Sequence, residues 1–174
     1  MNVSASTQAI LKAIEKYQEF LSELDEDRFR ETPAENVWSY SEVYCHIVQA
    51  NLRSLLAVQK CIYGKPGIFG NIPLLSRAVL FFGRFPPVKL KAPEGIAALV
   101  KKISKEEARN DLIRLKTKVL ELAPKVPKRL KDTRVKHPRL GMLNAAEWWR
   151  FVEIHSNHHL KQLKRIEKMF KRRT

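Results

Sequence analysis

Three stretches of the chain open with the same helix-start signal, and this repetition most restricts what the sequence can fold into. Ser39-Tyr40-Ser41-Glu42, Ser104-Lys105-Glu106-Glu107 and Asn144-Ala145-Ala146-Glu147 each place a glutamate three residues after a serine or an asparagine. In such a capping box the two side chains satisfy each other's free backbone amides at the start of a helix. Apolar residues then recur at steps of three and four, which is the spacing of an amphipathic helix.

The apolar stripes predict four long helices. The first runs from about Thr7 to Asp25, the second follows Trp38, the third ends at Pro124, and the fourth continues from Asn144 close to the C-terminus. The stripes, in chain order, are Leu11, Ile14, Tyr17, Leu21 and Leu24; Val43, Ile47, Ala50, Ser54, Leu55 and Val58; Ala108, Leu112, Leu115, Val119 and Leu122; and Trp148, Val152, His155, His159, Leu163, Ile166 and Phe170. Strand alternation and Asn-Gly or Asp-Gly hairpin turns are absent from the sequence.

The connection between the second and third helices is unusual. Residues 63–90 contain four Gly and four Pro, yet they are also rich in large apolar side chains. A short helix from Pro73 to Gly83 is predicted, since proline suits the first turn of a helix. The segment caps the core, forms one wall of a substrate pocket, or makes a dimer contact. The predicted fold is therefore all-α: a four-helix bundle with a long, partly helical apolar connection between helices 2 and 3.

Length and composition favour one domain over residues 1–174 in the cytoplasm. Hydrophobic residues make up 44% of the chain, which is enough for a sizeable core. No run approaches the ~20 apolar residues that span a bilayer, and the first residues lack the pattern of a secretory signal. Cys45 and Cys61 lie too far apart on one predicted helix to pair, so both are expected to be reduced thiols.

The positive charge is unevenly distributed. The net charge is +15, but residues 1–36 carry 4 basic and 8 acidic groups, which leaves +19 on residues 37–174. Such a balance permits binding to nucleic acid or to an anionic membrane through the basic C-terminal helix. The alternative is a solvated helix face, and this alternative is favoured because only Phe170 interrupts the basic run with an aromatic ring.

Three histidines are the candidate metal ligands. His155 and His159 are four residues apart, and therefore share one face of a helix within its apolar stripe. His46 borders the inward face of the second helix, whereas His158 points elsewhere. Three neutral imidazoles with an open fourth position are typical of a catalytic zinc site. The alternative is that the histidines are satisfied polar groups of the core.

Two motifs resemble the DinB-like family. Trp38-Ser39-Tyr40-Ser41-Glu42-Val43-Tyr44-Cys45-His46-Ile47 is similar to its second-helix signature, and Asn144-Ala145-Ala146-Glu147-Trp148 through His155-x-x-x-His159-x-x-Gln162-Leu163 is similar to its last helix. His137-Pro138-Arg139-Leu140-Gly141 also resembles the lead-in to that helix. The resemblance implies a four-helix bundle, often a homodimer, that binds a divalent metal through His46, His155 and His159.

The resemblance does not name the reaction. It implies a metal-dependent enzyme of the thiol-dependent S-transferase or hydrolase type, in which the metal lowers the pKa of a bound thiol or water. Zinc and nickel both suit three imidazoles, and a low-molecular-weight thiol is a possible cofactor. A structural or sensory metal module without turnover is the second hypothesis, and a nucleic-acid or anionic-membrane binder is the third. The small-molecule substrate is unknown.

Other residues have more than one interpretation. Gln162 is a polar residue of the bundle or contacts a metal-bound water, and Tyr44 packs or lines the pocket mouth. Glu147 is read as a helix cap and Glu153 as a solvent-facing charge, with a supporting role beside the metal as the alternative for both. Trp148 and Trp149 are expected to pack, and His137 to be structural.

Overall fold

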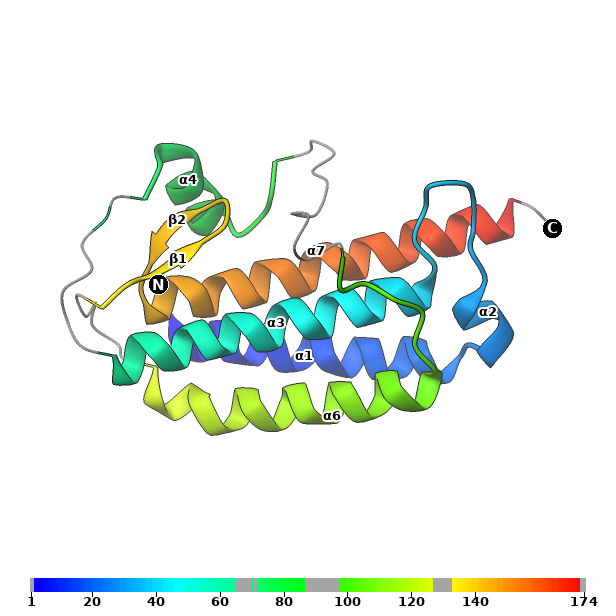
Figure 1. Cartoon of the computed structure of the whole chain (residues 1–174), viewed down its shortest axis with the longest axis horizontal. Coiled ribbons are helices and arrows are strands. Elements are labelled where there is room, and N and C mark those ends of the chain that lie inside the picture. The colour runs from blue at the N-terminus through cyan, green and yellow to red at the C-terminus, as the bar shows by residue number, and fades with distance from the viewer. Residues whose placement is uncertain (1, 65–69, 71, 87–97, 127–132, 173–174) are drawn as a thin grey trace.

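The computed structural model describes residues 2–64, 70, 72–86, 98–126 and 133–172. Four long helices lie side by side: α1 (Val3–Ser22), α3 (Tyr40–Tyr63), α6 (Lys105–Leu122) and α7 (Ala145–Lys171). The shorter elements are α2 (Glu26–Arg30), α4 (Leu74–Phe82), a 3-10 turn (Ala123–Lys125), β1 (Val135–His137) and β2 (Gly141–Leu143). The protein is a four-helix bundle, as the sequence predicted (Figure 1). No described helix is both long enough and apolar enough to cross a bilayer.

The bundle has an up-down-down-up arrangement. In Figure 1, α1 and α7 run in one direction, and α3 and α6 run in the other. Hydrogen bonds support this order: Ser41, at the start of α3, donates from Oγ to the carbonyl of Ile103 and accepts from its backbone N–H, just before α6. Because α3 and α6 are parallel, the connection between them has to cover the length of the bundle. The 24 residues of α3 make that length roughly 36 Å. This distance explains the long connection.

The described part of that connection contains the predicted short helix. α4 covers Leu74–Phe82, with Pro73 immediately before it and Gly83 after it in the left-handed conformation, at a φ of 66°. α4 lies on α7 and contacts it. Residues 65–69, 71 and 87–97 of the connection lie outside the described residues. They include Ile68 and Phe69, two of the large apolar side chains of this segment.

The core follows the predicted stripes closely. Every stripe residue of α3, α6 and α7 is buried. In α1 the buried face is instead Ser6, Ile10, Ala13, Ile14, Tyr17 and Leu21, so Leu11 lies at its border. Its helix also starts four residues earlier than predicted and ends three residues earlier, because Asn2 caps Ala5 N and Asp25 starts the separate helix α2.

The expectation of no strands was wrong for one small hairpin. β1 and β2 pair in antiparallel register, with Val135 opposite Leu143 and His137 opposite Gly141. The turn lacks the Asn-Gly signal because it is a three-residue loop closed by Gly141, whose φ is 83°. His137 closes the turn with its side chain, since its Nδ1 accepts hydrogen bonds from the N–H groups of Arg139 and Leu140.

Candidate metal centre

His46 is placed by the start of α3. Ser39 accepts the N–H of Glu42, and the Glu42 carboxylate in turn accepts the N–H and the hydroxyl of Ser39. Ser39 is completely buried. This closed capping box fixes where the helix begins, and therefore which face the residue two turns later presents. That residue is His46, which faces α7.

His155 and His159 are placed by α7 in the same way. Asn144 and Glu147 form the capping box at its start, and Arg134 adds an ion pair to Glu147 at 3.1 Å. Glu147 is therefore a helix cap, as predicted. The apolar stripe of α7 faces the bundle, and the two histidines lie within it, one helical turn apart.

The three histidines converge on one point. The Nε2 atoms of His155 and His46 are 3.3 Å apart, and those of His155 and His159 are 3.1 Å apart. One ring nitrogen from each of the three residues lies within 4.8 Å of the others. Each residue is only 6% exposed. The structure thus brings together all three histidines that the sequence singled out.

Two side-chain amides set the orientation of the imidazoles. His155 Nδ1 lies 2.9 Å from Asn51 Oδ1, and His159 Nδ1 lies 2.6 Å from Gln162 Oε1. An amide oxygen can only accept a hydrogen bond, so each Nδ1 carries a hydrogen and is the donor. Asn51 is held this way round because its Nδ2 donates to Ser156 Oγ at 3.0 Å. In the neutral rings both Nε2 atoms therefore present lone pairs to each other.

These facing lone pairs test whether the residues fit a metal ion. Two unprotonated nitrogens 3.1 Å apart repel each other, and no hydrogen bond between them is possible. A cation placed between them removes the repulsion. Two nitrogens bound at 2.0–2.1 Å to a tetrahedral ion lie about 3.3 Å apart, close to the separations found here. The donor set therefore fits a divalent metal.

Burial keeps the histidines in the neutral form that binds metal. Burial, aided by the charge of His158, lowers the pKa of His46 to about 4. Burial, and then the charges of His159 and His46, lower the pKa of His155 well below its ordinary value. Burial, and then the charges of His46 and His158, lower the pKa of His159 in the same way. A further polar atom, His46 Nδ1, is buried without a hydrogen-bond partner among the described residues.

Aromatic rings surround the cluster. Trp38 contacts the ring of His46, with ring centres 5.2 Å apart, and Phe151 stacks on His155 at 5.4 Å. His158 does not join the cluster; its ring lies against Phe85 at 5.2 Å and beside His159 at 5.0 Å. The rings limit access of water to the imidazoles.

Trp148 and Trp149 are buried and pack, as expected. Tyr44 does not line a pocket mouth, because it is fully buried and its hydroxyl donates to the carbonyl of Tyr17. Glu153 is not a solvent-facing charge, because its side chain is 14% exposed and pairs with Arg150 at 2.5 Å.

The two cysteines agree with the sequence prediction, whereas Asn51 was not among the predicted site residues. Cys45 and Cys61 are free and buried, in agreement with the prediction of unpaired thiols. Asn51 was missed by the sequence reasoning. The available signal was an uncharged polar residue inside the apolar stripe of the second helix, four residues after Ile47 and four before Leu55.

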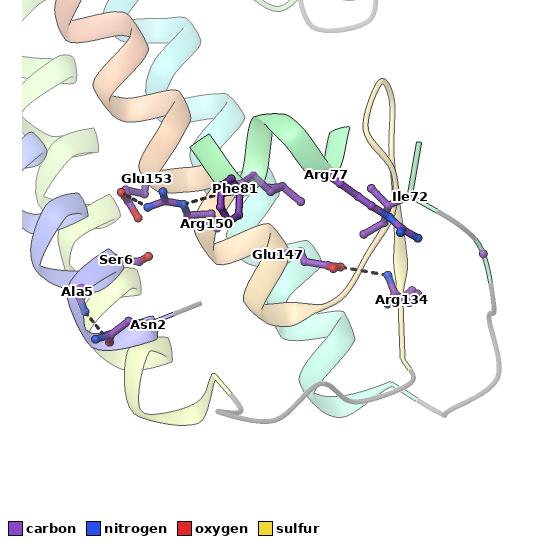
Figure 2. Close-up of a pocket in the computed structure, with 12 residues that line it drawn as sticks. Asn2, Ala5, Ser6, Ile72, Arg77, Phe81, Arg134, Glu147, Arg150 and Glu153 are labelled. Atoms are coloured by element: carbon purple, nitrogen blue, oxygen red, sulfur yellow. Dashed lines mark hydrogen bonds and ion pairs between the residues drawn. The ribbon is translucent and has the colours of Figure 1, made fainter. Parts of the chain in front are cut away.

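A cavity of about 550 Å³ lies at another place in the fold. It is bounded by the start of α1, by α4, by the hairpin segment and by α7 (Figure 2). The ion pairs Arg134–Glu147 and Arg150–Glu153 lie in its wall. None of the three clustered histidines lines this cavity.

Comparison with known proteins agrees with the fold. TT2238, described as a four-helix bundle protein, matches with 20% identity and a TM-score of 0.53 over 94% of this chain and 98% of that one. YfiT from Bacillus subtilis, described as a probable metal-dependent hydrolase with an unusual four-helix bundle topology, matches with 11% identity and a TM-score of 0.67 over 97% and 87%. No curated protein matches the sequence. The sequence model of the DinB superfamily matches residues 9–163, and the chain therefore belongs to the DinB superfamily.

Proposed function

We propose that this protein binds one divalent metal ion through His46, His155 and His159 and uses it in a hydrolase-type reaction. The observation that carries the proposal is the contact between the Nε2 atoms of His155 and His159. These two unprotonated nitrogens lie 3.1 Å apart in a buried site. Membership of the DinB superfamily and the similarity to YfiT, a probable metal-dependent hydrolase, support it. Zinc and nickel are the proposed metals, because both favour imidazole ligands.

A metal held by three neutral imidazoles supplies an open position at which water or a thiol has a lowered pKa and becomes a nucleophile at neutral pH. The chain's own residues prepare that site. Asn51 and Gln162 hold the imidazoles of His155 and His159 in the tautomer that leaves Nε2 free. Trp38 and Phe151 cover two of the rings.

We also propose which nucleophile the site activates and how the protein assembles. A low-molecular-weight thiol in place of water would make the protein an S-transferase, and the positive charge of the chain favours an anionic thiol. A homodimer is proposed from the family resemblance alone. Sedimentation velocity tests the dimer, and a screen with thiols and electrophiles, run beside ester and amide substrates, tests the nucleophile.

The decisive experiment is metal analysis by mass spectrometry on untagged protein. About one zinc or nickel per chain is expected, lost in His46→Ala and in His155→Ala. His137→Ala is the matched control, since His137 is a half-buried histidine that closes the hairpin turn outside the cluster. Protein that takes up no zinc or nickel would overturn the proposal. Stoichiometric metal without turnover of any substrate, with a large loss of stability on chelation, would favour the structural metal module instead.

A further inference from the structure

The outer face of α4 is apolar and exposed. Leu74, Leu75, Phe81 and Phe82 are 83%, 67%, 81% and 64% exposed, although all four lie on one nine-residue helix. Among the described residues, no other helix carries more than two exposed large apolar side chains. An apolar patch gathered on one helix is a mark of an interaction surface, whereas single exposed residues are not.

α4 carries large apolar side chains on both its inward and its outward side. Ser76, Val79 and Leu80 face inward and are buried against the bundle. Leu74, Leu75, Phe81 and Phe82 lie on the other side of the helix and are exposed, and Phe81 also borders the open cavity beside α7. The inward face attaches α4 to the bundle, whereas the outward apolar side chains remain exposed in the described structure.

α4 is fixed in this orientation by α7. Arg150 of α7 donates from Nε to the carbonyl of Leu80 at 3.2 Å, and its guanidinium lies so close to Gly83 that it would meet a side chain there. Figure 2 shows Arg150 beside Phe81, with Glu153 on its other side. The apolar side chains are therefore presented outward by a held helix.

The charge around α4 selects the partner. In the sequence, residues 43–93 contain no Asp or Glu. Arg77 and Arg84 are exposed beside the apolar face, and the neighbouring hairpin adds exposed Lys136 and Arg139. The nearby acidic residues of α7, Glu147 and Glu153, are paired with Arg134 and Arg150.

We propose that α4 is an interfacial helix that docks this protein on an anionic lipid bilayer. Basic groups meet the lipid head groups, while Leu74, Leu75, Phe81 and Phe82 enter the boundary between head groups and acyl chains. A second copy of the chain is a poorer occupant of this face, since it would bring Arg77 and Arg84 of two chains together. A nucleic acid would satisfy the charge but would leave the leucines without a contact.

The experiment is co-sedimentation of the full chain with vesicles of phosphatidylcholine, alone or containing about one third phosphatidylglycerol. Strong binding is expected only with the anionic lipid. Phe81→Ser/Phe82→Ser, which spares the buried face of α4, should reduce the partition coefficient about tenfold or more. Ile113→Ser/Leu120→Ser is the matched control, because both residues are half exposed on α6 at the opposite side of the bundle.

Two more readouts separate insertion from adsorption by charge. Arg77→Gln/Arg84→Gln should weaken binding, while Arg109→Gln/Arg114→Gln on α6, which removes the same charge, should leave it nearly unchanged. The emission of Phe81→Trp should shift to the blue on anionic vesicles, and that of Ile113→Trp should not. The proposal would be overturned if the wild type did not bind anionic vesicles. It would also be overturned if the Phe81→Ser/Phe82→Ser variant bound them as strongly as the wild type. The proposal would also be overturned if the wild type bound no vesicles and the Phe81→Ser/Phe82→Ser variant changed from dimer to monomer.

Discussion

Asn51 connects the histidine cluster to the rest of the core. Its Oδ1 accepts a hydrogen bond from His155 and its Nδ2 donates one to Ser156, so a flip of the amide would break both interactions. Ser156 in turn donates to the carbonyl of Val152, and its own carbonyl accepts the hydroxyl of Tyr17. Hydrogen bonds from α1, α3 and α7 therefore meet at Ser156, and the one between its hydroxyl and Asn51 sets the tautomer of His155.

Replacing Asn51 by alanine should weaken metal binding while the three histidines remain. Loss of a partner behind a metal-bound imidazole typically costs 10–100-fold in affinity, and a loss of about that size is expected. Competition with a chromophoric chelator measures it. Ser54→Ala is the control, since Ser54 is also buried on α3 but donates only to the carbonyl of Ala50. Equal affinity in both variants would show that Asn51 does not orient His155.

The low pKa of His46 predicts an acid-sensitive metal-free protein. A histidine with an ordinary pKa of 6.5 when unfolded and about 4 when folded binds its proton first in the unfolded chain. Its contribution to stability is therefore complete above pH 6.5 and is lost as the pH falls towards 4, for a total of about 3 kcal/mol. The pKa values of His155 and His159 are lowered as well and act in the same direction.

Urea unfolding of the chelated protein between pH 7 and pH 5 tests this. The free energy of unfolding should fall across this range, in which few carboxylates titrate. His46→Phe should show a shallower fall, since one of the groups that the unfolded chain protonates is gone. A free energy of unfolding that is constant over the range would mean that the histidines are not buried in neutral form.

At the scale of the elements, helix starts position the chemistry. α3 and α6 both open with a serine–glutamate capping box, but only α3 carries a member of the histidine cluster. Ser39→Ala and Ser104→Ala should each lower the free energy of unfolding by about 1 kcal/mol. Only Ser39→Ala should also weaken metal binding, because the first turn of α3 sets the direction of His46. Chelator competition on both variants separates the two effects, and equal affinities would contradict the prediction.

The same capping boxes explain why so much of the bundle could be predicted from the sequence. Ser39, Ser104 and Asn144 mark their helix starts as predicted, and the 3.6-residue period places His155 and His159 on the inner face. Both signals are local, so a single sequence carries them. Convergence of His46 with the other two was inferred from the inward phase of both helices and from family resemblance.

The features that were missed depend on contacts that are distant in sequence or on short turns. Asn51 meets His155 104 residues away, and a stripe of residue types does not show what such a residue will meet. The hairpin has three residues per strand, too few for an alternating pattern. Glu153 was assigned to solvent because the sequence does not show that Arg150, its partner three residues earlier on α7, is held by the carbonyl of Leu80 in α4.

At the scale of the whole molecule, the histidine cluster joins parts of the chain that are far apart. His46 and His155 are separated by 109 residues, and they belong to antiparallel helices that pack against each other. A metal bound by both would close a long loop, which restricts the unfolded chain more than a local contact does. Because the intact site exists only in the folded protein, metal binding should stabilise the bundle as a unit.

This stabilisation gives a thermal prediction. Free zinc or nickel at about 100 times its dissociation constant should add about 2.7 kcal/mol to the free energy of unfolding. For a chain of this size that corresponds to a rise in Tm of about 5–10 °C. Calorimetry on chelated protein, before and after one of these ions is added back, measures the shift. His155→Ala should melt at the same temperature with and without the ion, whereas His137→Ala should keep the full shift. A Tm that rises equally in the wild type and in His155→Ala would place the bound ion elsewhere on the chain and separate it from the three histidines.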